Sequence, residues 1–318
     1  MQRVAPEISI LMAAHGLRAE IAAAVASIFV HAEGAAVEVI IASDDGTDYR
    51  DCLPPDPRLV FAAIGPIASG APAARNRALA LARGHFITML DADDAYEGEA
   101  HGLAEALALA RAEGAAVIPS VIRTPDGAEL RRVPPAGTQS LGLRAWREVF
   151  ASLHVLRPRA KAAPFHPFRL IDDVWSDLRA LAEAGGRAPV CSALAYRYQL
   201  RPGQLTETRA ASFDADYAEA LAMLRDDPEA FGAATAEVAR ILWRWRAMNR
   251  WAERATQRNT RQLGHYHRHV GPIWQAAAAL NGAAHPARHS APPGQALVQC
   301  GSADCISQAG QTATATRS

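Results

Sequence analysis

Short apolar runs alternate along this chain with stretches in which apolar residues recur every three or four positions. The segments 8–12, 37–43 and 86–90 consist mainly of apolar and β-branched residues, which is typical of buried strands. Apolar residues recur at helical spacing in 17–31, and 73–82 and 97–114 are expected to form two further helices. A β-hairpin is expected around Asp126 and Gly127. This order of strands and helices predicts an α/β fold with helices packed on a sheet.

Acidic residues directly follow two of these predicted strands. The run 86–90 continues into Asp91, Asp93 and Asp94, and 37–43 continues into Asp44 and Asp45. Clustered carboxylates raise one another's pKa unless a cation or hydrogen-bond donors compensate, and open α/β sheets bind ligands outside the carboxyl ends of their strands. The pattern predicts a crevice that holds a divalent metal with a phosphate behind it. An Asp-rich turn that caps the next helix is the structural alternative.

A second carboxylate pair, Asp172 and Asp173, opens a predicted amphipathic helix. On local pattern alone, Asp172 is a good N-cap and Asp173 a good first-turn residue. Further along, 194–206 reads as a strand and loop in which alternation places Arg197 and Arg201 where a guanidinium could reach phosphate oxygens. An ordinary exposed edge strand is the alternative interpretation of that segment.

Composition limits the possible functions. The 318 residues, 50% hydrophobic and 21% charged, suffice for a full core. The 33 basic and 33 acidic residues cancel, which argues against nucleic acid as a partner. Without a long apolar run or a signal peptide, we expect a cytoplasmic protein.

The four cysteines lack zinc-site spacing and are expected to be unpaired thiols. They are Cys52, Cys191, Cys300 and Cys305.

Taken together, five segments resemble successive motifs of the family 2 glycosyltransferases. These segments are 8–12, 38–46, 74–79, 84–87 and 90–94, in the order and spacing of that family. The resemblance extends over about the first 210 residues. It implies the GT-A fold, a Rossmann-like mixed sheet flanked by helices. It also implies inverting, metal-dependent transfer of a sugar from a nucleotide-sugar, expected to be UDP-linked, to a saccharide or lipid-linked acceptor.

The resemblance also implies roles for single residues. Asp93, with Asp91 or Asp94 nearby, would hold Mn²⁺ or Mg²⁺ against the diphosphate as a DXD motif. Asp173 would be the catalytic base that takes the proton of the acceptor hydroxyl, while Asp172 caps the helix. Contacts to the nucleotide-sugar are expected from Ala13, His15, Asp45, Arg75, Asp91, Asp172, Arg197 and Arg201. Within this set, Asp45 would accept from uracil N3–H, Arg75 would lie against the carbonyl edge, and Ala13 and His15 would line the base pocket.

Other nucleotide-binding classes lack their motifs here. The residues after 8–12 are not the Gly-rich, Arg-containing loop of a nucleotidylyltransferase, no GxGxxG follows that run, and Ala95 stands where a haloacid-dehalogenase-like phosphatase expects Thr or Val. One alternative from another class stays open. It is a non-catalytic nucleotide-sugar-binding or scaffold protein of the same fold.

We expect three regions along the chain. Residues 1–210 would be the catalytic domain, with a nucleotide-sugar part at about 1–118 and an acceptor part at about 119–210. Residues 211–282 would form a helical extension with helices at 214–225 and 229–258. Residues 283–318 are polar and rich in Pro and Gly, and disorder is expected there.

The helix predicted at 229–258 admits two interpretations. Its apolar face is expected to comprise Phe231, Val238, Ile241, Leu242, Trp245 and Met248. It could clamp the catalytic domain and leave its arginines solvated. Alternatively, together with Trp243, Trp245 and Trp251, it could lie peripherally on the anionic inner face of a membrane. The alternating His265, His267 and His269 lack a neighbouring carboxylate or Cys and are expected in a polar loop or strand.

Overall fold

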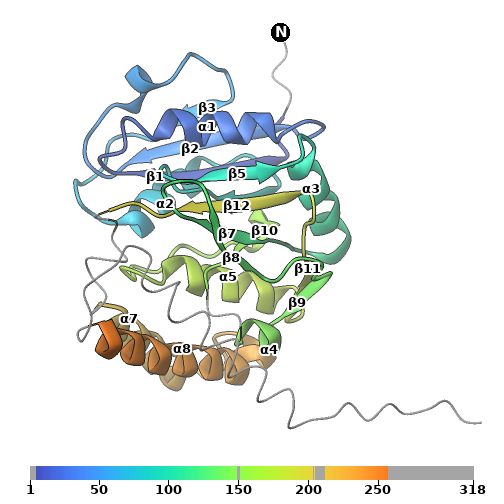
Figure 1. Cartoon of the computed structure of the whole chain (residues 1–318), viewed down its shortest axis with the longest axis vertical. Helices are drawn as coiled ribbons and strands as arrows, with labels where there is room; N and C mark the ends of the chain where they lie inside the picture. The colour runs from blue at the N-terminus through green and yellow to red at the C-terminus, as the bar shows by residue number, and fades with distance from the viewer. Residues whose placement is uncertain (1–4, 149–150, 203, 205–211, 257–318) are drawn as a thin grey trace, which may run out of the picture.

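The computed structural model describes residues 5–148, 151–202, 204 and 212–256. Its centre is a six-stranded sheet with the order β3-β2-β1-β4-β10-β6 (Figure 1). The strands of this sheet are β1 (Ile8–Ala14), β2 (Val37–Ser43), β3 (Leu59–Phe61), β4 (Phe86–Met89), β6 (Ala116–Ile118) and β10 (His154–Pro158). The first four run parallel, whereas β10 runs antiparallel to both β4 and β6. The predicted α/β fold with a mixed sheet is confirmed.

Helices cover both faces of this sheet. The helices of this part are α1 (Ile21–Val30), α2 (Ala71–Leu81) and α3 (Gly102–Glu113). Ile8, Ile10 and Met12 of β1 share a core with α1 and α3, while Leu11 shares a core with α2. The alternation of side chains along a strand therefore assigns each face its own helices. The tight 3₁₀ turns are η1 (Tyr49–Cys52), η2 (Arg159–Lys161) and η3 (Gly232–Ala234).

A second, four-stranded sheet has the order β5-β12-β7-β8. Its strands are β5 (Ala95–Gly98), β12 (Leu194–Gln199), β7 (Ser120–Arg123) and β8 (Glu129–Val133). β7 and β8 form the hairpin expected around Asp126 and Gly127, and Gly127 adopts the positive φ, 86°, that a tight turn requires. Two short strands, β9 (Ser140–Gly142) and β11 (Arg187–Pro189), pair separately beside the short α4 (Leu143–Trp146).

The remaining helices form a layer below the sheets in Figure 1. They are α5 (Asp172–Glu183), α7 (Ser212–Asp226) and α8 (Thr235–Thr256). Val238, Ile241, Leu242 and Trp245 of α8 are buried in one core with α4, α5 and α7. The Trp245 indole N–H donates to the Arg147 carbonyl at 3.1 Å. The clamp interpretation of this helix is therefore confirmed, and the expectation that Trp245 faces a membrane is wrong.

Two helix boundaries differ from the sequence prediction. A helix was expected to run from 97 to 114, but 95–98 is strand β5 and α3 begins at Gly102. β5 forms because it pairs with β12, a contact that local propensity does not encode. α8 begins at Thr235 rather than 229, because a 3₁₀ turn at Gly232, with φ of 54°, precedes it.

Several predictions concern residues outside the described ones. These are the three histidines at 265–269, Cys300 and Cys305, and the tail from 283. Among the described cysteines, Cys52 and Cys191 are free thiols, as expected. In the part of the chain that the structure covers, no helix has both the length and the apolarity needed to cross a bilayer.

Candidate functional site

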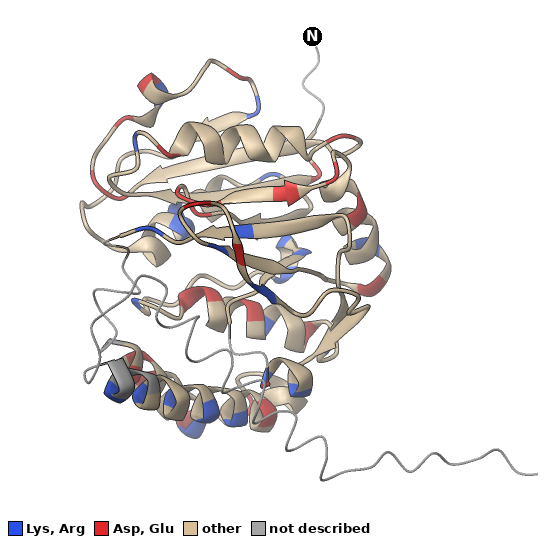
Figure 2. Cartoon of the chain, viewed as in Figure 1, with Lys and Arg blue, Asp and Glu red and all other residues tan. Residues whose placement is uncertain are grey.

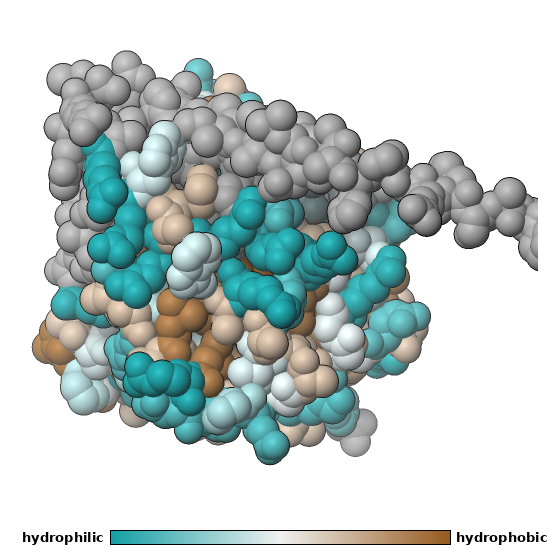
Figure 3. All heavy atoms as spheres, turned by 90° about the horizontal axis from the view of Figure 1, so that it is seen from below, coloured by the Kyte–Doolittle hydropathy of each residue, from teal (hydrophilic) through white to brown (hydrophobic). Residues whose placement is uncertain are grey.

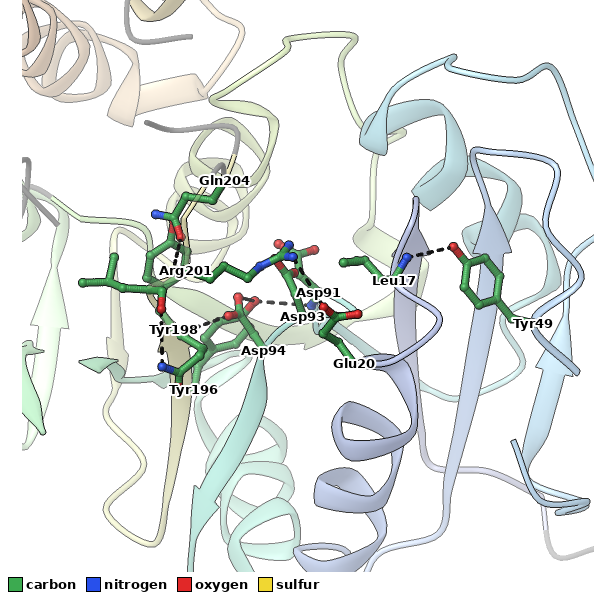
Figure 4. A network of polar contacts seen from close by, with 12 residues as sticks. Leu17, Glu20, Tyr49, Asp91, Asp93, Asp94, Tyr196, Tyr198, Arg201 and Gln204 are labelled. Atoms are coloured by element: carbon green, nitrogen blue, oxygen red, sulfur yellow. Dashed lines mark hydrogen bonds and ion pairs between the residues drawn. The ribbon is translucent and has the colours of Figure 1, made fainter. Parts of the chain in front are cut away.

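The candidate site lies where β1, β2 and β4 end. Because these strands are parallel neighbours, the residues after them meet at one edge of the sheet. Hydrogen bonds and ion pairs bring two further segments to the same edge, namely the start of α5 and the end of β12. Figure 4 shows the part of this edge that includes Asp91, Asp93, Asp94, Tyr196 and Arg201.

Asp45, in the acidic turn after β2, accepts four hydrogen bonds. Its Oδ2 accepts from Gly16 N at 2.6 Å and from the Tyr49 hydroxyl at 2.9 Å, while its Oδ1 accepts from Thr47 N and the Ser43 hydroxyl, both at 2.9 Å. Although burial opposes it, these donors hold the pKa of Asp45 well below its usual range. Asp45 therefore fastens the turn after β1 to the end of β2.

Asp44, beside it, fixes the start of α2. Its carboxylate accepts from Ser69 N and Gly70 N, both at 2.9 Å, and from the Ser69 hydroxyl at 2.6 Å. The exposed ring of His15 lies with Nδ1 3.7 Å from Asp44 Oδ2. Ala13, the partly buried residue before the end of β1, pairs in register with Ala42. Sequence reasoning placed Asp44 in the acidic turn but did not assign it a role.

The carboxylates after β4 are neutralised differently. Asp91 accepts from Arg75 at 2.5 Å, and Asp93 forms an ion pair with Arg201. Asp94 is buried, with Oδ2 accepting from the Tyr196 hydroxyl at 2.6 Å and Oδ1 from Gln199 N at 2.9 Å. Burial and the neighbouring carboxylates raise the pKa of Asp93, and they raise that of Asp94 well above its usual range.

Arg75 joins the end of β4 to the start of α5. This buried guanidinium donates to both Asp91 and Asp172. Its helix is held against the segment before α5 by a reciprocal pair of bonds: Asn76 Nδ2 donates to the Phe165 carbonyl at 2.9 Å, and Phe165 N donates to Asn76 Oδ1 at 2.7 Å. Burial raises the pKa of Asp172 to about 7, against the opposing charge of Arg75.

Asp173 lies in the first turn of α5 and is partly buried. Its Oδ1 accepts from Val174 N at 2.8 Å. Burial raises the pKa of Asp173 above its usual range, although Arg75 opposes the shift. The expected capping role of Asp172 is wrong: Ile171 is the N-cap without a side-chain bond, because the Asp172 carboxylate turns to Arg75 instead.

The two arginines predicted to act together have different surroundings. Arg201, just after β12, reaches Asp93 and lies 3.9 Å from Glu20 at the start of α1 (Figure 4). Arg197 lies within β12, on the opposite face from Tyr196, and its Nε is buried without a hydrogen-bond partner. None of the contacts described for the carboxylates after β4 involves Arg197.

Sequence reasoning missed the support beneath the carboxylates. The Tyr196 hydroxyl holds Asp94 and lies 3.3 Å from Asp91 N, and its ring stacks on His154 at 3.5 Å between centroids. Burial lowers the pKa of His154 to about 3, so the imidazole is neutral. The only local signal was the Tyr-x-Tyr pattern of β12, which does not reveal a partner 102 residues earlier.

The carboxylate oxygens at this edge are chemically suited to bind a hard divalent cation. Carboxylate oxygens are the ligands that Mg²⁺ and Mn²⁺ prefer. Asp91 and Asp93 present such oxygens and now pair with guanidinium groups, so a positive charge already stands at each. Over the described residues, no group of three or more His, Cys, Asp or Glu side chains is arranged to hold a metal ion.

Comparisons with known proteins bear on the fold and on the matched segment. Residues 9–154 match the family described as Glycosyl transferase family 2, and Asp172 and Asp173 lie beyond that match. The crystal structure of TarS 1–349 from S. aureus is similar with a TM-score of 0.54 and 18% identity, over 80% of this chain and 76% of that one. The structure of the mannosyltransferase PcManGT from Pyrobaculum calidifontis in complex with GDP-Man and Mn²⁺ is similar with a TM-score of 0.47 and 15% identity. The similarity covers 87% of this chain and 81% of that one. None of the curated protein sequences compared with this chain matches it.

Proposed function

We propose that this chain, whose residues 9–154 match the family described as Glycosyl transferase family 2, transfers a sugar from a UDP-sugar to an acceptor hydroxyl with inversion at the anomeric carbon. The acceptor class we propose is a saccharide or a lipid-linked saccharide. The observation that carries the proposal is the bridge through Arg75, which pairs with Asp91 after β4 and with Asp172 at the start of α5. This bridge brings carboxylates suited to the cation of a donor diphosphate next to Asp173, the carboxylate proposed to take the acceptor's proton.

On the donor side, Asp91 and Asp93 would hold the divalent cation. When bound, that cation would offset the negative charge that develops on the leaving diphosphate. Arg201 supports this assignment, because its guanidinium already compensates the charge of Asp93. With a cation bound there, Arg201 would be free to donate to phosphate oxygens, which suit the geometry of a guanidinium group. Asp94 contributes by positioning, since both its oxygens are engaged by β12.

At the nucleobase, Asp45 is proposed to accept from uracil N3–H. A carboxylate offers about four lone-pair sites, and four donors already occupy those of Asp45. Binding of uracil would therefore require the Ser43 or Tyr49 hydroxyl to turn away. The depressed pKa of Asp45 keeps it ionised and hence an acceptor. Ala13 and the exposed His15 would line this pocket.

On the acceptor side, Asp173 would act as the general base. It would take the proton of the acceptor hydroxyl as the oxygen attacks the anomeric carbon from the face opposite the diphosphate. Its raised pKa suits this role, because a base works best when its pKa approaches the working pH. Arg75 holds Asp172 next to Asp173, and its positive charge limits how far the pKa of Asp173 rises.

A ligand panel tests the donor assignment. UDP-, GDP- and dTDP-sugars are compared by thermal shift with Mn²⁺ and with excess EDTA, since a ligand at 100 times its dissociation constant stabilises by about 2.7 kcal/mol. We expect UDP-sugars to stabilise the protein only when the cation is present, and Asp93→Ala to abolish this dependence. Asp56→Ala is the matched control, because it removes another Arg-paired carboxylate, partnered by Arg58, outside the site.

Two results would contradict parts of the proposal. Equal stabilisation by UDP in EDTA would remove the metal role of Asp93 and Asp91. Sugar binding without release of UDP in the presence of saccharide and lipid-linked acceptors would favour the non-catalytic nucleotide-sugar-binding alternative.

A further inference from the structure

The side of α8 that faces away from the protein carries an unusual set of exposed residues. Trp243 is 67% exposed and Trp251 41% exposed, whereas most large apolar side chains of the chain are buried. We define the outer face of α8 as Arg240, Trp243, Ala247, Arg250, Trp251 and Arg254, all exposed and spaced at three or four residues. The opposite side of α8 is buried in the core, so the helix is anchored, and the six residues of the outer face are exposed in the part of the chain that the structure describes.

Positive charge remains in excess around this face after every described ion pair is counted. Five arginines form ion pairs with only three carboxylates in this region. Glu148 contacts Arg147 and Arg244, Glu237 contacts Arg147 and Arg240, and Asp214 contacts Arg246 and Arg250. Basic residues accordingly recur along α8 in Figure 2. The side chains of Arg240 and Arg250 keep 62% and 52% of their surface exposed, so their charge is available to a partner.

The two tryptophans add an amphipathic component to this charge. Ala247 stands one helical turn from each of them, and its small side chain leaves both indoles uncovered. Seen from below the view of Figure 1, the described surface mixes hydrophilic and apolar residues (Figure 3). Exposed indoles among guanidinium groups match the lipid headgroup region, where Trp is enriched and Arg pairs with phosphates.

We propose that the outer face of α8 docks this protein onto an anionic phospholipid surface. The apolar side of α8 is committed to the protein core, so the contact is shallow, made by two indoles and the guanidinium groups around them. Attraction to anionic headgroups must then supply most of the affinity, and binding must weaken as salt rises. A membrane is favoured over nucleic acid because the chain as a whole is formally neutral and because two exposed indoles stand among the arginines of this face.

The docking face is connected to the candidate site through α7. α8 packs on α7, and Asp216 of α7 accepts from Leu170 N at 2.7 Å, just before Asp172 and Asp173. α7 thus links the helix that carries the outer face to the segment that leads into the proposed base. The relevance of this to a lipid-linked acceptor rests on the proposed function, whereas the docking itself is measured without any donor or acceptor.

Sedimentation with vesicles tests the proposal on the full chain. The protein is expected to sediment with vesicles of phosphatidylcholine and phosphatidylglycerol and to stay in solution with phosphatidylcholine alone. Arg240→Gln with Arg250→Gln should weaken binding by about 25-fold, at about fivefold for each arginine. The matched control is Arg50→Gln with Arg111→Gln, which removes two paired arginines of similar exposure, 59% and 54%, from elsewhere on the surface. That pair should leave binding unchanged.

A second variant separates the indoles from the charge. Trp243→Ala with Trp251→Ala should reduce vesicle binding severalfold, while the melting temperature stays near that of the parent because both side chains are exposed.

An equal loss in the Arg50 and Arg111 control would overturn the proposal, and so would equal binding to phosphatidylcholine alone. Binding to homopolymer RNA in preference to anionic vesicles would assign the face to nucleic acid. Self-association abolished by the tryptophan substitutions would assign it to a second copy of this chain. Inactive transfer with intact vesicle binding would count against the proposed function only.

Discussion

Two acidic turns end parallel strands that lie on either side of β1, yet their carboxylates are stabilised by opposite means. After β2, Asp44 and Asp45 accept from backbone amides and hydroxyl groups of nearby turns. After β4, Asp91 and Asp93 pair with guanidinium groups from α2 and from the end of β12. The pKa of Asp45 is accordingly lowered, whereas that of Asp93 is raised by burial and by Asp91.

This difference affects how easily each turn exchanges its partners. Amide donors in a folded turn are fixed, so the turn after β2 shapes the edge of the sheet, and a ligand gains an oxygen of Asp45 only when the Ser43 or Tyr49 hydroxyl turns away. The side chain of Arg201 is 33% exposed and can leave Asp93 to another cation, whereas the buried Arg75 keeps its place between Asp91 and Asp172. The same sequence pattern, a strand followed by acids, thus covers two physical roles.

The largest effect is expected at Asp173, whose carboxylate accepts from a backbone amide, that of Val174, as the carboxylates after β2 do. Asp173→Asn should lower the rate of sugar transfer by about 10² to 10⁴, the range for loss of a general base, while UDP affinity and melting temperature stay near normal. Asn keeps the shape of Asp and can still accept from Val174 N in the first turn of α5, so the comparison isolates proton transfer. Near-normal transfer would remove the base assignment.

Asp172→Asn should instead act on stability. Asp172 is a partner of the buried Arg75, and weakening one side of a buried ion pair costs about 3 kcal/mol of unfolding free energy. Urea denaturation measures the loss. If stability is unchanged and only transfer falls, Asp172 belongs to the chemistry rather than to the bridge between β4 and α5.

Asp45→Ala and Asp93→Ala compare the two turns directly. Removing Asp45 leaves two amides and two hydroxyls without an acceptor and should lower the unfolding free energy by about 2 kcal/mol. Removing Asp93 relieves repulsion with Asp91, and should cost little stability. Equal losses in urea denaturation would show that both turns are structural.

The pH dependence of transfer is the finest of these comparisons. Asp173 must be ionised to accept a proton, and its pKa is raised, so kcat/KM should fall about tenfold per pH unit below that pKa. The ordinary pKa of Asp is about 4. The acid limb should therefore appear at a higher pH than that value. UDP affinity should not follow this limb through Asp45, whose lowered pKa keeps it ionised. A limb at the ordinary pKa of Asp would contradict the shift.

The sequence predicted the parts of the fold that local pattern encodes. The strands at 8–12, 37–43 and 86–90 and the apolar side of α8 follow from alternation and helical spacing, and the acids follow from their position after strands. Long-range partners could not be read in this way. Nothing near Arg75 indicates Asp172, 97 residues away, and nothing near Asp94 indicates Tyr196. The expected cap at Asp172 failed for this reason, since a distant guanidinium took the carboxylate that a helix start would otherwise use.

The place of β10 in the sheet has a consequence for how the chain is made. β10 lies between β4 and β6 although it follows both in the chain, so neither β4 nor β6 gains that neighbour until residues 154–158 have left the ribosome. A nascent chain that has passed β6 exposes two unpaired strand edges, which are sites of wrong pairing between chains. The N-terminal half therefore cannot mature ahead of the rest, and any fragment that ends before Pro158 is expected to aggregate during synthesis.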